Sequence, residues 1–316
     1  MKIFITREIP SIGIELLKKK GFIVSVYKKD NPIPHNEFLK LIKNYDGVIT
    51  LLSDKIDKEV IDEMKNCKVI ANYAVGFNNI DVDYANSKGI VVTNTPDVLT
   101  DSTADIAMAL VLACARRIPE SEKFVRNKKF VGWKPKLFLG MELRNKNFGI
   151  LGAGRIGTAV AKRAHSFGCE ILYYSNSRNQ YLETKLNAKK VSLKSILKKS
   201  DIISLHLPLN TKTKNLLNAE NLKLLKPSAI LINTARGEIL DETYLIKMLK
   251  QKKLVAAGLD VYDGEPNIKK DFYDLENVIL LPHIGSATTE ARNKMSLLAA
   301  KNVIAVLSGK NAITPV

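Results

Sequence analysis

The chain has 316 residues, of which 46% are hydrophobic and 26% are charged. These values are ordinary for globular proteins, so they exclude disordered, collagen-like and membrane-spanning classes, and the length predicts two domains. The 49 Lys and Arg residues outnumber the 32 Asp and Glu residues, giving a net charge of +17. Because the lysines are not interleaved with aromatic residues, we interpret this charge as a solvated surface that favours anionic small molecules, with no nucleic-acid partner.

The cysteines and the first residues indicate the cellular setting. Cys67, Cys114 and Cys169 are odd in number and far apart, so we expect neither a disulfide framework nor a metal site. No stretch approaches the roughly 20 apolar residues of a membrane span, and residues 1–6 do not resemble a signal peptide. The sequence therefore predicts a cytoplasmic protein without a membrane partner.

Short β-type runs alternate with helical patterns along the chain, which is typical of parallel α/β sheets. The first series of expected strands is 2–6, 22–27, 47–50, 69–71 and 90–92, with helices that include 13–20 and 36–42. The second series is 148–151, 170–174, 201–205, 229–233, 254–259 and 278–281. Six strands with five intervening helices predict a complete dinucleotide-binding sheet in this second series.

Two long helical patterns, 104–117 and 291–307, lie at the edges of the second series. The first is apolar nearly all round, which indicates burial between layers. We interpret both as crossings between domains. The predicted domains are therefore 1–98 together with 286–316, and an inserted domain over 99–285.

Residues 147–163 combine a strand, a complete GxGxxG and an amphipathic helix. In such a motif Gly152 allows the tight turn, Gly154 lets the backbone approach a pyrophosphate, and Gly157 lets the helix pack close to the strand. The N–H groups near Arg155 and Ile156 then face the anion at the positive end of the helix. This context predicts a dinucleotide cofactor.

The end of the next strand indicates which dinucleotide is used. An NAD-preferring site places an acid here, but the residues are Ser175, Asn176, Ser177 and Arg178. A carboxylate would repel a 2′-phosphate, whereas Ser and Asn can donate to one and Arg178 can pair with it. The sequence therefore favours NADP(H), with NAD(H) as the alternative.

Reactive side chains follow the last three expected strands. Arg236 follows the first of them, Glu265 lies after the second, and His283 follows the third. Ligands of such sheets bind outside the carboxyl ends of the strands, so the three can converge. An Arg suits a carboxylate or a carbonyl oxygen, a His transfers protons near neutral pH, and a Glu orients that His. Around a nicotinamide, this set predicts 2-keto acid reduction.

Together these segments resemble the D-isomer-specific 2-hydroxyacid dehydrogenase family over essentially the whole chain. The similar segments are 72–81, 94–105, 152–157, 233–237, 258–266 and 282–288. Segments 133–140 and 173–178 are most similar to the glyoxylate/hydroxypyruvate reductase branch. The resemblance implies an α/β fold of two doubly wound parallel-sheet domains, with a Rossmann cofactor domain (99–285) inserted in a flavodoxin-like substrate domain.

The resemblance also implies roles for individual residues. Arg236 would polarise the keto acid, Glu265 would support the histidine, and His283 would be the acid/base. The N–H groups of Val75 and Gly76 would bind the substrate carboxylate, beside Leu99. The expected cofactor residues are Thr103, Ala153, Gly154, Arg155, Ile156, Ser175, Asn176, Ser177, Arg178, Thr234, Ala235, Asp260 and Gly285.

Several alternatives stay open at this point. The resemblance implies a homodimer whose Trp133 reaches the neighbouring subunit, but that tryptophan also fits a substrate rim or plain packing. His206, at a strand end, is interpreted as structural, with the adenine side of the cofactor site as the alternative. A D-lactate or D-3-phosphoglycerate dehydrogenase is the second enzymatic hypothesis. A dinucleotide-sensing protein similar to the C-terminal binding protein corepressors is the non-catalytic one.

Overall fold

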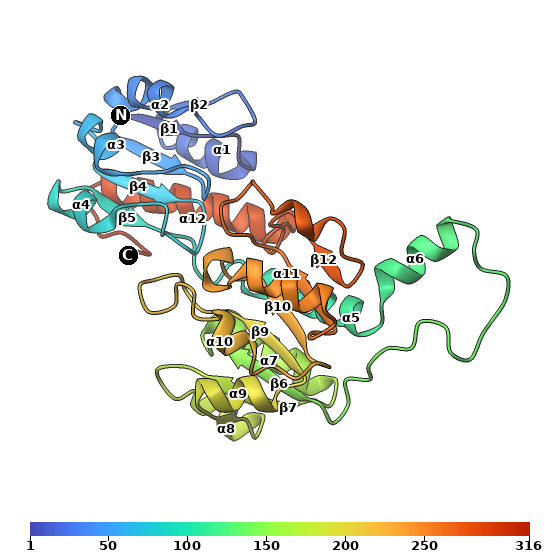
Figure 1. Cartoon of the computed structure of the whole chain (residues 1–316). Coiled ribbons are helices and arrows are strands. Elements are labelled where there is room, and N and C mark those ends of the chain that lie inside the picture. The colour runs from blue at the N-terminus through green and yellow to red at the C-terminus, as the bar shows by residue number, and fades with distance from the viewer. The chain divides into compact units, whose positions relative to one another are not determined.

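The computed structural model describes residues 1–316, coloured along the chain in Figure 1. Contacts between residues divide the chain into two units, Met1–Leu99 with Ser286–Val316, and Thr100–Gly285. The division expected from the sequence differs from this one only in the placement of Leu99. None of the helices combines the length and apolar character that a bilayer crossing needs.

The first unit is built on a parallel sheet in the order β2-β1-β3-β4-β5. Its strands are β1 (Lys2–Ile5), β2 (Ile23–Val26), β3 (Gly47–Thr50), β4 (Val69–Asn72) and β5 (Val91–Thr93). Its helices are α1 (Ser11–Lys19), α2 (His35–Leu41), η1 (Ile42–Asn44), α3 (Lys58–Glu63), α4 (Val82–Ser87) and α12 (Thr289–Leu307). This is the flavodoxin-like strand order.

Helices cover both faces of the first sheet. Apolar side chains of α2, α3 and α4 form one core with those of the strands. On the other face α12 contacts β3, β4 and β5 and packs closely on α1. A Cβ at Gly13 would lie 2.4 Å from the Ser296 carbonyl oxygen, so only glycine permits this approach of the two helices. The C-terminal helix therefore completes the unit that the N-terminus begins.

The second unit contains a seven-stranded parallel sheet in the order β12-β11-β10-β9-β6-β7-β8. Its strands are β6 (Asn147–Leu151), β7 (Glu170–Tyr174), β8 (Lys189–Lys190), β9 (Ile202–Leu205), β10 (Ile230–Asn233), β11 (Ala256–Leu259) and β12 (Val278–Leu280). Its helices are α5 (Thr100–Ala115), α6 (Ile118–Arg126), α7 (Arg155–Ser166), α8 (Gln180–Lys185), α9 (Leu193–Lys199), α10 (Ala219–Leu222), η2 (Gly237–Ile239), α11 (Glu242–Lys250) and η3 (Lys270–Phe272).

Two details of the predicted sheet are wrong. The expected six strands omit β8, a two-residue strand of lysines that pairs with β7 at the sheet edge and carries no apolar signal. In addition, β11 and β12 are joined by the short η3 in place of a full helix. With β8 included, six of the strands follow the 3-2-1-4-5-6 dinucleotide-binding order, and β12 extends the sheet.

Helix α5 has nine buried residues distributed around its axis and packs against both α7 and the sheet. It shares one apolar core with α7, whereas α9, α10 and α11 share the core on the opposite face. Because these strands are parallel, the carboxyl ends of β6, β7, β9, β10 and β11 lie at one edge of the sheet, where α7 begins after β6. The residues predicted to act on cofactor follow these ends.

Beyond α5, α6 and the segment up to residue 139 project from the rest of their unit (Figure 1). No residue of α6 is buried. Contacts at the base hold this arm: Met141 N–H donates to the Ala115 carbonyl at 2.7 Å, and Arg117 lies over the Phe138 ring. Trp133 is 83% exposed, so the packing interpretation of this tryptophan is wrong within the single chain.

Candidate active site

The loop from β6 to α7 is shaped by three glycines. Gly152 has φ +100°, and a Cβ there would lie 2.5 Å from the His206 carbonyl oxygen. A Cβ at Gly157 would lie 2.0 Å from the Gly152 carbonyl oxygen. At Gly154, in contrast, no atom lies within 4 Å of the corresponding position. Two glycines thus serve packing inside the protein, and the third leaves open space outside it.

The amino end of α7 borders that open space. No side chain caps this helix and its first turn contains no acid, so its positive end has no built-in anion. Asn179 holds the loop in place by donating to the Ala153 carbonyl at 2.9 Å and to the Thr158 hydroxyl at 2.8 Å. An open approach to uncapped helical N–H groups fits the pyrophosphate of a dinucleotide.

The turn after β7 has a feature that the sequence did not reveal. Asn176, Ser177 and Arg178 are exposed, as a ribose-binding turn requires. The Arg178 guanidinium, however, is paired with Glu183 of α8, its Nη2 donating to Oε2 at 2.8 Å. Arg178 therefore already has an anionic partner at the position where a 2′-phosphate was expected.

Glu265 and His283 form a hydrogen-bonded pair. The His283 Nδ1 lies 2.8 Å from Glu265 Oε2, and Glu265 Oε1 accepts the Tyr262 N–H at 2.9 Å. Burial raises the pKa of Glu265, but the hydrogen bond and charge of His283 outweigh it and hold that pKa below its usual value. An ionised Glu265 fixes the ring orientation of His283, while Nε2 is left for a substrate proton.

Asp260 fixes the loop that carries the histidine. Its two carboxylate oxygens accept the N–H groups of Ile284 and Gly285, each at 2.8 Å. Burial raises the pKa of Asp260, and these two hydrogen bonds oppose the shift. They help to hold His283 at φ +55°, a backbone conformation that L-residues seldom adopt. Thr103 of α5 lies against Gly285.

Arg236 lies at the junction of β10 and η2, in extended backbone conformation. Asn233 secures this junction, donating to the Arg236 carbonyl at 2.8 Å and accepting the Ala235 N–H at 3.0 Å. Burial lowers the pKa of Arg236, whereas the charges of Glu238 and Glu265 act in the opposite direction. A guanidinium stays charged in proteins, so the second unit combines a fixed cation with the Glu265–His283 pair.

In the first unit, the loop after β4 turns its carbonyl groups towards asparagines. Asn94 donates to the Val75 carbonyl and Asn72 to the Gly76 carbonyl, both at 2.8 Å. No backbone carbonyl accepts the N–H group of Val75 or that of Gly76. Such adjacent N–H groups suit a carboxylate. Leu99, which follows this unit's last strand, is buried.

Two buried polar atoms at the ends of β9 and β10 lack hydrogen-bond partners. They are the Thr234 hydroxyl and Nδ1 of His206. The other ring nitrogen of His206 lies 2.8 Å from the Ser204 hydroxyl. Burial lowers the pKa of His206 to about 3, so its ring is neutral. Since buried polar groups are normally satisfied, these two atoms fit a bound polar molecule at this edge of the sheet.

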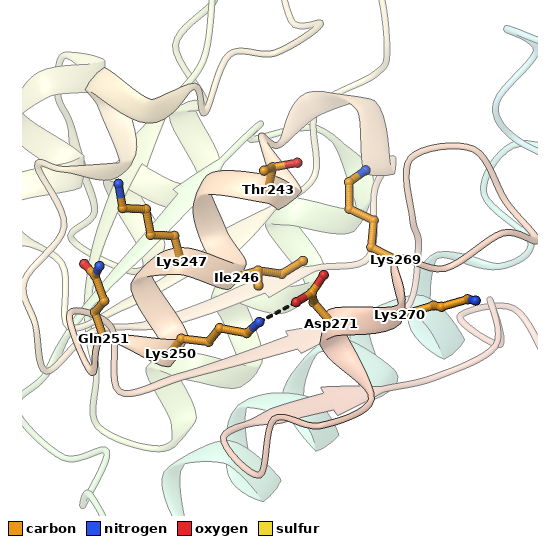
Figure 2. Close-up of a pocket in the computed structure, with 8 residues that line it drawn as sticks. All are labelled: Thr243, Ile246, Lys247, Lys250, Gln251, Lys269, Lys270 and Asp271. Atoms are coloured by element: carbon orange, nitrogen blue, oxygen red, sulfur yellow. Dashed lines mark hydrogen bonds and ion pairs between the residues drawn. The ribbon is translucent and has the colours of Figure 1, made fainter.

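A cavity of about 510 Å³ lies elsewhere on the second unit, between α11 and η3 (Figure 2). Four lysines line it, but Lys250 is paired with Asp271 and Lys269 with the buried Glu242. In Figure 2 Lys270 points away from the Lys250–Asp271 pair. None of the predicted site residues lines this cavity, so it is separate from the candidate active site.

Residues 108–285 match the model of the D-isomer specific 2-hydroxyacid dehydrogenase, NAD binding domain. The chain is also 48% identical to a glyoxylate reductase of Thermococcus litoralis over 98% of this chain and 94% of that one. The chain belongs to the D-isomer specific 2-hydroxyacid dehydrogenase family. Its second unit is accordingly a nicotinamide dinucleotide-binding domain, and the expected oxidoreductase class is confirmed.

Solved structures of the family share the fold of the whole chain. The TT0316 protein of Thermus thermophilus has a TM-score of 0.94 at 41% identity, with full coverage of both chains. An NADPH-dependent glyoxylate/hydroxypyruvate reductase of Sinorhizobium meliloti, solved with NADP and malonate, has a TM-score of 0.87 at 31% identity and covers 100% of this chain and 96% of its own. These likenesses confirm the two-domain α/β fold predicted from the sequence.

The sequence missed the residues that position the site. Asn72 and Asn94 orient the loop after β4, which contains Val75 and Gly76. Asn179 holds the loop between β6 and α7, and Glu183 holds Arg178. Asn72 and Asn94 begin two of the segments that resemble the family, but an Asn or Glu close to a motif is common in any loop or helix, so the sequence did not indicate these roles. Their partners are set by how the chain folds, so a linear pattern could not identify them.

Proposed function

We propose that this chain reduces small 2-keto acids, glyoxylate and hydroxypyruvate first among them, to D-2-hydroxy acids with a reduced nicotinamide dinucleotide. The observation that carries the proposal is the Glu265–His283 pair at 2.8 Å in a unit that also holds the buried Arg236. The histidine of such a pair can donate a proton to a developing alkoxide, and the guanidinium can stabilise the negative charge of that alkoxide. The glyoxylate reductases among its relatives support the substrate class, and they favour it over lactate, phosphoglycerate or non-catalytic alternatives.

Each of these residues has a separate role in the proposed reaction. When bound, the reduced nicotinamide supplies a hydride to the carbonyl carbon. Arg236 holds the carbonyl oxygen and stabilises the negative charge that forms there. His283, kept in orientation by Glu265, delivers a proton from Nε2 to that oxygen. In the first unit, the N–H groups of Val75 and Gly76 are the donors that we propose for a substrate carboxylate, with Leu99 as a further substrate residue.

The proton-transfer role is tested with His283→Ala, assayed with glyoxylate and hydroxypyruvate. We expect kcat to fall about 10²- to 10⁴-fold, while the Kd for NADPH changes little. Glu265→Gln, which keeps the shape of the side chain, should give a smaller loss. Turnover at the wild-type rate in His283→Ala would refute the assignment.

We further propose NADPH as the preferred cofactor. The residues proposed to bind NADPH are the cofactor residues predicted from the sequence. Among them, the turn from Ser175 to Arg178 contains no acid that would repel a 2′-phosphate. Lys190 of β8 lies beside this turn, its Nζ donating to the Asn176 carbonyl at 3.0 Å. A comparison of kcat/KM with NADPH and NADH tests the preference. Equal or better use of NADH would refute it and leave the reaction class intact.

We also propose that the arm containing α6 joins two copies of the chain. The arm exposes Phe130, Val131, Trp133 and Leu139, of which Val131 is 82% exposed. A run of exposed apolar side chains of this kind marks a protein–protein interface. In sedimentation velocity, the wild type should be a dimer and Val131→Asp a monomer. A monomeric wild type would refute the proposal.

A further inference from the structure

The turn that ends β7 is coupled to α8 by an acid placed five residues beyond it. Arg178 Nε and Nη2 both reach Glu183 Oε2, at 3.1 and 2.8 Å. Glu183 Oε1 accepts a further hydrogen bond from the Tyr173 hydroxyl at 2.5 Å. The Tyr173 ring is buried in β7, so Glu183 is anchored to the strand that positions the turn.

The two partners differ in exposure. The Arg178 side chain is 75% exposed, whereas that of Glu183 is 18% exposed. The hydrogen bonds from Arg178 and Tyr173 lower the pKa of Glu183, so it stays ionised at neutral pH. Glu183 is thus the fixed member of the pair, and Arg178 is the member that a ligand can reach.

Three charged side chains take part in the contacts at the turn. Arg178 and Lys190 supply two positive charges, and Glu183 supplies one negative charge. The sum for these three side chains is +1, whereas an NAD-preferring site has an acid at the end of the second strand. Removing Glu183 would raise the sum to +2. The acid therefore opposes 2′-phosphate binding at a turn that otherwise favours it.

We propose that Glu183 is a specificity-determining residue, which limits the discrimination between 2′-phosphorylated and 2′-hydroxyl dinucleotides by holding Arg178. The inference rests on the proposed function, because it takes the adenosine ribose to bind at the end of β7. A 2′-phosphate must compete with Glu183 for the guanidinium, and it also experiences the repulsion of the carboxylate. A 2′-hydroxyl, which is uncharged, experiences neither effect.

The test is the variant Glu183→Gln, which removes the charge and keeps an oxygen that can accept from Tyr173. Kd values for NADPH and NADH are measured by calorimetry on the full chain, without substrate. We expect the preference for NADPH, the ratio of the two Kd values, to rise about 2- to 5-fold, the size of one surface charge interaction. Glu63→Gln removes the same charge from a surface pair with Lys43 in the first unit and should leave the ratio unchanged.

A second background shows whether the effect passes through Arg178. In Arg178→Ala, the further change Glu183→Gln should alter the ratio by less than half of its effect in the wild type. An unchanged or reduced ratio in Glu183→Gln, or the full increase in the Arg178→Ala background, would overturn the inference. If the wild type binds neither nucleotide, both the inference and the proposed function fail. If it binds NADH better, only the NADPH preference fails, and the shift caused by Glu183→Gln still decides the inference.

Discussion

The glycines of the β6–α7 loop lead to a prediction in which two nearby substitutions differ in their effect on stability. Gly157→Ala would place a Cβ 2.0 Å from the Gly152 carbonyl oxygen and 3.0 Å from a methyl group of Ile150. The helix must then move about 1.5 Å from the strand to restore ordinary contact. Gly154→Ala, with φ −78° and no atom within 4 Å, meets no such obstacle.

The magnitudes follow from these contacts. Overpacking costs about 1–3 kcal/mol, and Gly157→Ala belongs at the upper end because the opposing atom is a backbone carbonyl that cannot rotate away. At about 2–4 °C per kcal/mol for a unit of this size, its Tm should fall by about 5–10 °C. Gly154→Ala should change the free energy of unfolding by less than about 0.5 kcal/mol. Its methyl group, however, occupies the space that a pyrophosphate needs, so the Kd for NADPH should rise at least about tenfold.

The assay is a pair of measurements on each variant, thermal unfolding without cofactor and calorimetric titration with NADPH. Only Gly157→Ala should lose stability, and both variants should lose affinity. If Gly154→Ala bound NADPH as tightly as the wild type, the pyrophosphate would not lie against this loop. If Gly154→Ala lost as much stability as Gly157→Ala, the space beside it would not be open.

Three further predictions concern single buried polar groups. Asp260→Asn leaves one acceptor oxygen for two N–H groups, so one of them loses its hydrogen bond. The free energy of unfolding should therefore fall by about 1–3 kcal/mol in denaturant titrations, and kcat should fall because the His283 loop is held less firmly. Thr234→Val removes a buried hydroxyl that has no partner in the protein, so stability should be unchanged or higher. The same change removes a hydrogen-bonding group proposed for the cofactor, so the Kd for NADPH should rise about 2- to 10-fold in calorimetry. Burial raises the pKa of Asp54 above 3.8, so the folded protein keeps a proton on this carboxyl at pH values where the unfolded protein has lost it. The free energy of unfolding should therefore fall as pH rises from 3.8 through the raised pKa. Asp54→Asn should lack this fall. If the free energy of unfolding changed with pH in parallel in the two proteins, Asp54 would not be its cause.

Much of the fold and of the reactive set could be predicted from the sequence. Alternation of apolar runs with amphipathic helices specifies parallel sheets, since only crossover connections join such strands. In a parallel sheet the carboxyl ends share one edge, so residues that follow different strands, such as Glu265 and His283, come together without any knowledge of side-chain conformation. The glycine spacing likewise has steric causes that are local, as Gly152 and Gly157 illustrate.

What the sequence alone determined was therefore the order of the elements and the residues at the ends of strands, because both depend on periodicity and on short loops. Only the tertiary structure decided the pairing of Arg178 with Glu183, the second strand partner of β7 at Lys189–Lys190, and the turning of the Val75 and Gly76 carbonyls towards asparagines. These features depend on which side chains of separate elements meet and which rotamers they adopt. No linear period encodes such contacts, so a charge such as that of Arg178 can be recognised in the sequence while its partner cannot.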